Sequence, residues 1–374
     1  MGSSDQTNGS RLAQEGDLVF VGVNYRLGAL GWLHRPGIVD AQPGLSDMIA
    51  ALHWVRDHIA GFGGDPSRVT VMGQSAGANA IARMLMTPGI DAPSRRAILQ
   101  SPALGLGFLT PAMAAATGDQ FLRLLEIDPD GGDALTRLRA TEVGRLLQAQ
   151  AELMRSTARF ARIEPPFMPV VPTSMTQAEL LDAIAEGAKG SGVDMLIGAT
   201  ADEAHAFFAA NPAMENPPVE AVLDRFGGEE RLASYRARRP GATTMDLLAD
   251  LETDETFLRP MRDLADAVAA HNGTSYTYLF DWAPPASRFK SCHVIEMPFV
   301  FGTYDAYHDA PMMAGGDPRQ IVDLSTAVRL AWISFIRDGT PEHSLIPSWP
   351  AYDVIHRPTM HLGARIGIIG LASG

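Results

Sequence analysis

The residues best placed to do chemistry are the pentapeptide 73–77, Gly-Gln-Ser-Ala-Gly, in which Ser75 stands between two glycines. An apolar run at 69–72 precedes it and a run of small residues at 76–86 follows it, so we predict a sharp strand-to-helix turn. The glycines would leave room for that turn, and the Ala76 N–H could donate to a developing oxyanion. This pattern is typical of a nucleophilic serine. The plain alternative is a strand–turn–helix whose serine only forms hydrogen bonds.

A serine hydroxyl is a weak nucleophile at neutral pH, so it needs a histidine as base and a carboxylate that orients the histidine. In folds that present the serine on such a turn, the acid and then the histidine follow it along the chain. Seven histidines follow the serine here, and their pattern alone does not choose among them: His205, His271, His293, His308, His343, His356 and His361.

Short apolar runs alternate with helical stretches, which is typical of a mostly parallel sheet with helices on its faces. The predicted strands are 18–24, 69–72, 97–100, 195–199 and 276–282, and the clearest predicted helices are 45–59 and 324–337. We therefore predict an α/β fold in a single domain over residues 1–374. Two helical insertions, at about 105–190 and 205–270, would form the cap and walls of a pocket.

Several segments around the serine resemble a known family. Residues 24–33 (NYRLGALGWL) are similar to its N-Y-R-x-G-x-x-G-F-L segment, and residues 44–66 carry its G-L-x-D, A-L-x-W-V and F-G-G-D-P elements in order. The pentapeptide 73–77 follows at the expected distance. The chain thus resembles the type-B carboxylesterases, the group that includes cholinesterases and bacterial p-nitrobenzyl esterases. The resemblance implies the α/β-hydrolase fold and a serine hydrolase that cleaves carboxylic esters.

The resemblance also implies the two partners of the serine. Residues 196–204 (LIGATADEA) are similar to the family's strand that ends in Asp-Glu-Gly, which implies Glu203 as the acid, with Asp202 its nearest rival. Residues 293–302 (HVIEMPFVFG) are similar to the segment that opens with the family's catalytic histidine, which implies His293 as the base. The plain alternatives are a solvated carboxylate and a hydrogen-bonded loop histidine. The implied triad needs no metal and no cofactor.

Two further positions would support this triad. Gln74 stands where the family more often has a buried glutamate, so this chain lacks a charge that the family usually places beside the serine. Ser101 stands where the family often has a serine behind the triad, and an ordinary serine at a strand end is the equal alternative.

The first residues of the chain show no counterpart of the family's opening strands or of its glycine-rich oxyanion turn, so the resemblance implies truncation at the N-terminus. In the family, one of those strands lies between the counterparts of segments 18–24 and 69–72. Without it, we expect either a gap between the two segments or their direct pairing. The loss of one oxyanion donor can slow such an enzyme by about 10²–10³-fold.

Composition and motifs disfavour other classes. The net charge of −13 repels nucleic acid and anionic membrane surfaces, and no apolar run is long enough to span a bilayer. Cys292 is the one cysteine, and the chain opens without a basic cluster and an apolar run, so we expect a cytoplasmic protein. No G-x-G-x-x-G follows a strand and no H-E-x-x-H is present, which disfavours a dehydrogenase and a zinc hydrolase.

Three functions stay open at this point. The first is an esterase that acts on small to medium uncharged carboxylic esters as small-molecule substrates. The second is a catalytically impaired relic or a cholinesterase-like interaction module. The third keeps the triad and cleaves a carbamate, an amide or a lactone. The oligomeric state stays open as well.

Overall fold

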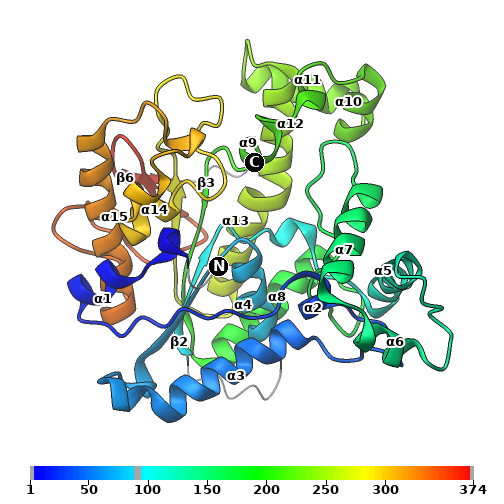
Figure 1. The fold of residues 1–374 in the computed structure, drawn as a ribbon. Coiled ribbons are helices and arrows are strands. Elements are labelled where there is room, and N and C mark those ends of the chain that lie inside the picture. Colours follow the sequence, from blue (N-terminus) through cyan, green and yellow to red (C-terminus); the bar gives the residue numbers. More distant parts are fainter. Residues whose placement is uncertain (1–3, 88–93, 371–374) are drawn as a thin grey trace.

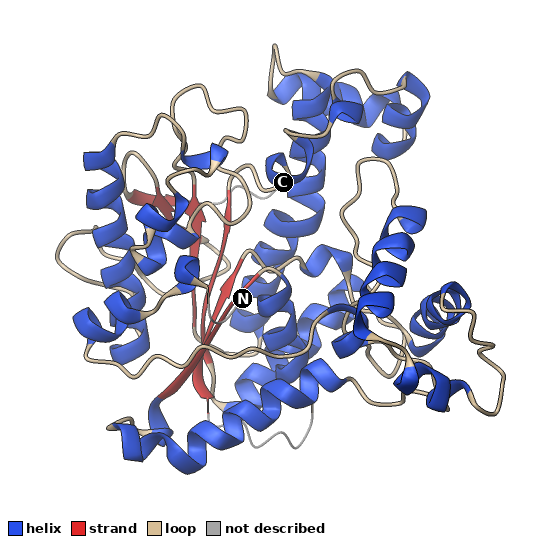
Figure 2. Ribbon diagram, viewed as in Figure 1, coloured by secondary structure: helices blue, strands red, loops and turns tan. Residues whose placement is uncertain are grey.

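A six-stranded sheet forms the centre of the computed structural model, which describes residues 4–87 and 94–370 (Figure 1, Figure 2). The strands follow one another across the sheet in chain order. Strands β1 to β5 pair in parallel, and β6 pairs antiparallel with β5. Their bounds are β1 Val69–Gln74, β2 Ser94–Gln100, β3 Asp194–Thr200, β4 Ser275–Phe280, β5 Pro358–Leu362 and β6 Gly367–Gly370.

Helices cover both faces of this sheet (Figure 1). The helices on one face are α3 Pro43–His58, α4 Ala76–Leu85, α8 Gln177–Ser191 and α13 Arg259–Ala270. The helices on the other face are α1 Ser10–Gly16, α14 Met297–Phe301 and α15 Pro318–Asp338. Within the described ranges, none of the helices combines the length and the apolar character needed to cross a membrane.

The remaining helices lie mainly in two long connections, from β2 to β3 and from β3 to β4. They are α2 Gly28–Trp32, α5 Pro111–Leu124, α6 Ala134–Ala140, α7 Val143–Thr157, α9 His205–Phe208, α10 Val219–Phe226, α11 Glu229–Arg238 and α12 Thr244–Thr253. Short 3₁₀ helices span Asp5–Thr7, Ile59–Phe62, Pro66–Arg68, Leu104–Leu106, Pro212–Met214, Tyr304–Tyr307 and Pro311–Met313. A π-helical turn, Asp254–Leu258, joins α12 to α13.

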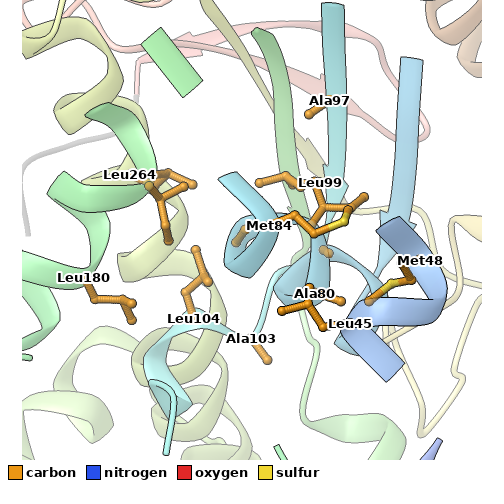
Figure 3. Packing of buried hydrophobic residues seen from close by; sticks show 14 of the residues in the cluster. Leu45, Met48, Ala80, Met84, Ala97, Leu99, Ala103, Leu104, Leu180 and Leu264 are labelled. Carbon is orange, nitrogen blue, oxygen red and sulfur yellow. The ribbon is translucent and has the colours of Figure 1, made fainter. Parts of the chain in front are cut away.

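Successive residues of the central strands pack into two different cores. Leu99 of β2 belongs to the core under α4, α8 and α13, whereas the preceding residue, Ile98, belongs to the core under α14 and α15. Figure 3 shows Leu99 together with Leu180 of α8 and Leu264 of α13 in the first core. Because both faces of a parallel sheet are buried, such strands are apolar at consecutive positions rather than at alternate ones.

The predicted α/β fold is confirmed, and most predicted elements are present. Strands β1 to β4 and helix α3 begin and end within three residues of the predicted ranges, whereas α15 begins six residues before its predicted start at 324. The prediction lacked β5 and β6. These two strands are five and four residues long and contain proline, histidine and glycine, so neither forms a sustained apolar run.

The predicted strand at 18–24 is wrong. This segment has no regular secondary structure and pairs with no strand in the described part of the chain. Strand β1 is therefore the edge of the sheet, and a cavity of about 1120 Å³ is lined by both β1 and the segment. We expected either a gap between segments 18–24 and 69–72 or their direct pairing, and the structure has the gap. An apolar run predicts burial, but a strand also needs a partner strand about 4.8 Å away.

The close packing of Gly198 against Tyr278 yields a test of the sheet. A Cβ on Gly198 would lie 2.1 Å from the ring of Tyr278, which is fully buried and would have to shift. We expect Gly198→Ala to lower the free energy of unfolding by about 1–3 kcal/mol, measured by urea denaturation. The matched control is Gly190→Ala in α8, where no atom lies within 4 Å of the added Cβ. Equal stability of the two variants would contradict this packing.

Candidate active site

Ser75 lies in a sharp turn between β1 and α4. Its backbone has φ 55° and ψ −121°, a conformation that residues with side chains rarely adopt. Its N–H donates to the carbonyl of Gln100 on β2 at 2.8 Å, which holds the turn in place. A Cβ on Gly73 would lie 2.5 Å from the carbonyl carbon of Gly77, whereas a Cβ on Gly77 would reach only Tyr25 Oη at 3.9 Å. The close approach that requires glycine is therefore at Gly73.

Glu203 and His293 form a buried pair beside this turn. Glu203 follows β3, His293 follows β4, and the carboxylate Oε2 accepts a hydrogen bond from imidazole Nδ1. The other carboxylate oxygen accepts from the Thr200 N–H at 2.7 Å. Asp202, the rival acid, accepts instead from the Ser291 N–H at 3.2 Å. The structure thus brings Glu203, and not Asp202, to the histidine.

Two aromatic rings flank His293. The ring centre of Phe257, in the π-helical turn, lies 5.2 Å from the imidazole centre, and that of Phe207 lies 5.4 Å away. Burial lowers the pKa of His293, but the charge and hydrogen bond of Glu203 outweigh burial, so the pKa is raised above its ordinary value. An imidazole in this setting can accept a proton during a reaction and hold it as a cation.

A glutamine contacts the second nitrogen of the imidazole. Gln74 Nε2 lies 3.1 Å from His293 Nε2, so the amide donates when the ring proton is on Nδ1, toward Glu203. Among the described residues, no hydrogen bond joins the Ser75 hydroxyl to His293. The structure therefore pairs the acid with the base and places the serine nearby without a direct bond.

Glu296 is a second buried carboxyl group near the pair, and the sequence patterns assigned it no role. Its Oε1 accepts from Gln100 Nε2 at 3.2 Å, and its Oε2 has no hydrogen-bond partner in the described part of the chain. Burial and then the charge of Glu203 raise the pKa of Glu296 to about 7. The sequence signal that could have identified Glu296 is the His-x-x-Glu spacing, because it places this carboxyl group three residues after His293.

The structure does not link Ser101 to the triad. Ser101 is buried after β2 with φ 47°, and its N–H donates to the Gly198 carbonyl at 2.7 Å. Its hydroxyl has no hydrogen-bond partner within the described ranges. Ala76, the predicted oxyanion donor, is the first residue of α4 and is exposed. N–H groups in the first turn of a helix lack an acceptor within the helix, so that of Ala76 is available to a ligand.

Asp246 of α12 connects the loop that carries the acid to the loop that carries the base. It contacts Lys290, which shortly precedes His293, and lies 3.2 Å from Nε2 of His205, which shortly follows Glu203. Burial alone would raise the pKa of Asp246, but its hydrogen bonds, first that with Lys290, hold this pKa well below its usual range. The charged carboxylate therefore holds the two loops together.

The other candidate histidines form contacts elsewhere. They pair as His271 with Asp182, His308 with Asp309, His343 with the Ala327 carbonyl, His356 with Asp353 and His361 with Asp281. Within residues 4–87 and 94–370, no group of three or more His, Cys, Asp or Glu side chains is arranged to hold a metal ion.

The family model described as the carboxylesterase family matches residues 1–367. The chain belongs to the carboxylesterase family. This carboxylesterase is 34% identical over 375 residues to the para-nitrobenzyl esterase of Bacillus subtilis (strain 168), covering 98% of this chain and 73% of that protein. It is also 34% identical to a probable N-octanoylanthranilate hydrolase of Rhodococcus erythropolis, and the match covers 96% of this chain and 72% of that protein. The solved structure of a thermophilic PNB esterase matches this fold with a TM-score of 0.82 and 33% sequence identity, and the match covers 98% of this chain and 74% of that chain.

These relatives establish the reaction class and the architecture. The protein is a carboxylesterase-type hydrolase with the α/β-hydrolase fold. Its relatives are named as esterases and hydrolases of small molecules, so the expected small-molecule substrate class agrees with the family.

Glu296 makes the stability of this carboxylesterase depend on pH. Its pKa rises from an ordinary 4.5 to about 7 on folding, so the folded chain holds this proton more tightly. The resulting stabilisation is complete below the unfolded pKa and is lost as the pH rises through the folded pKa. Glu296→Gln is neutral at every pH. We therefore expect its free energy of unfolding, relative to the parent, to rise by roughly 1–3 kcal/mol from pH 5 to pH 8.

Urea denaturation at the two pH values measures this difference. Glu152→Gln, on the exposed face of α7, is the matched control for the same chemical change. A difference between Glu296→Gln and the parent that does not change with pH would contradict the buried, protonated state of Glu296.

Proposed function

We propose that this protein hydrolyses carboxylic esters through an acyl-enzyme on Ser75, with His293 as the base and Glu203 as the carboxylate that orients it. The observation that carries the proposal is the buried Glu203–His293 hydrogen bond beside a serine held at φ 55°. A nucleophile, a base and a carboxylate that orients the base form the constellation that activates a serine hydroxyl on several unrelated folds.

In the proposed acylation, Ser75 Oγ bonds to the ester carbonyl carbon while its proton passes to His293 Nε2. The carbonyl oxygen becomes an oxyanion, which the Ala76 N–H stabilises by donating a hydrogen bond. The bond from carbon to the alcohol oxygen then breaks, and His293 gives the proton to that oxygen. Water attacks the acyl-enzyme in the same way, and Ser75 leaves with the proton returned by His293.

Glu203 contributes orientation and charge to these steps. By accepting the Nδ1 hydrogen, it keeps the Nε2 lone pair available for the serine proton. Its charge raises the pKa of His293 against the effect of burial and stabilises the imidazolium that forms. The Thr200 N–H holds the carboxylate in this orientation. None of the proposed steps uses a metal or a cofactor.

The two helical stretches at about 105–190 and 205–270 would form the walls of the substrate pocket. The second stretch brings Phe257 and Phe207 to His293, and Phe207 is 40% exposed, so an apolar surface lies open beside the base. Apolar walls favour uncharged acyl and alcohol groups, and the net charge of −13 disfavours anionic ones. We therefore assign small to medium uncharged esters as the substrates.

An amide is the second candidate substrate class. The relative from Rhodococcus erythropolis is named a probable N-octanoylanthranilate hydrolase, a name that places the acyl group on nitrogen. The same steps would cleave an amide if His293 protonated the departing nitrogen. Rates on an ester and an amide with the same acyl group separate the two classes.

Hydrolysis of p-nitrophenyl butyrate by the full chain tests the proposal. We expect Ser75→Ala to abolish turnover. We expect His293→Gln and Glu203→Gln each to lower kcat by about 10²–10⁴-fold, because the first removes the base and the second removes the carboxylate that orients it. His361→Gln is the matched control, because His361 also contacts a carboxylate, Asp281, at 3.1 Å but lies outside the proposed triad. Parent activity in Ser75→Ala, or no turnover by the folded parent, would overturn the proposal.

A further inference from the structure

We infer that Gln74 is a latch on the base: in the resting enzyme it occupies His293 Nε2, and it must leave before Ser75 can be activated. This inference rests on the proposed triad and adds a positioning residue to it. The observation behind it is the 3.1 Å separation between Gln74 Nε2 and His293 Nε2, which is a normal hydrogen-bond length.

His293 Nε2 is the atom that must receive the serine proton. Because Glu203 accepts from Nδ1, the ring proton stays there and the neutral imidazole has one lone pair for hydrogen bonding, at Nε2. The Gln74 amide donates to that lone pair, and no hydrogen bond between Ser75 and His293 is present in the described part of the chain. The glutamine and the serine therefore compete for one atom.

The glutamine, rather than the imidazole, is the group that can move. His293 is buried, and its ring nitrogen Nδ1 bonds to the Glu203 carboxylate. Its backbone N–H donates to the backbone carbonyl of Glu203 at 3.1 Å, and the rings of Phe257 and Phe207 flank the imidazole. Gln74 is half-buried at the end of the edge strand β1 and lines the cavity of about 1120 Å³. Its side chain therefore adjoins open space, and the latch requires it to turn into that space and free Nε2.

A glutamine also suits the charges around the base. Glu203 and Glu296 are both buried close to His293, so a third carboxylate at position 74 would favour the imidazolium and raise the pKa of the base further. The neutral amide adds no charge. It donates to the Nε2 lone pair of the neutral imidazole and so favours the uncharged form of the base.

The pH profile of kcat/KM for p-nitrophenyl butyrate tests the latch, because this profile reports the pKa of the base in the free enzyme. Gln74→Met keeps the length of the side chain and removes the donor. We expect kcat/KM at pH 8 to rise about two- to tenfold, the equivalent of one released hydrogen bond. We also expect the acid limb of the profile to move to higher pH, because the group that favoured the neutral imidazole is gone. Gln74→Glu should move this limb further in the same direction.

Gln150→Met is the matched control: it makes the same change at another half-buried glutamine, one that accepts from the Ala29 N–H at 2.8 Å, and should leave the profile unchanged. Circular dichroism melts establish whether each variant is folded. If Gln74→Met does not fold, the position of the acid limb in Gln74→Glu tests the latch instead. An unmoved acid limb with equal or lower kcat/KM overturns the latch, while the loss of turnover in Ser75→Ala still supports the proposed function. Full activity in Ser75→Ala overturns both.

Discussion

The hydrogen bond between His293 and Glu203 is the interaction on which the rest of the site depends. A buried carboxylate is costly unless it is paired and hydrogen-bonded, and here the imidazole takes one oxygen while the Thr200 N–H takes the other. The sheet makes this pairing possible because β3 and β4 are parallel neighbours, so the loops that follow them leave the same edge of the sheet. Asp246, between those loops, and Phe257, against the imidazole, then complete the enclosure.

The nucleophile is held differently from its proposed partners. Strands β3 and β4 each have a neighbour on both sides, whereas among residues 4–87 and 94–370 β1 pairs only with β2, and β1 lines the large cavity. The Ser75 turn therefore depends on its bond to the Gln100 carbonyl and on the close approach at Gly73. The contact from Gln74 to His293 joins this edge strand to the buried pair. In the proposed latch, a local movement of one side chain is therefore enough to convert the resting arrangement into an active one.

Local patterns in the sequence predicted what depends on local physics. Apolar runs located β1 to β4, because the strands of a parallel sheet carry apolar residues at consecutive positions, and the glycine pattern around Ser75 located the turn. The same reasoning failed at 18–24, because an apolar run does not show whether a partner strand is present to pair with it. Spacing could not choose His293 among seven histidines, and only the family resemblance did. The Gln74 contact joins residues 219 positions apart, and it depends on packing that no local pattern records.

The most direct test of the central claim is intact-mass analysis after treatment with a fluorophosphonate, with the parent and Ser75→Ala side by side. A fluorophosphonate bonds to a serine only when a base has activated its hydroxyl, so it reports the assembled triad independently of the substrate. The proposed triad predicts a single adduct on the parent and none on Ser75→Ala. A folded parent that takes up no adduct, or an adduct that persists in Ser75→Ala, would contradict Ser75 as the nucleophile activated by His293.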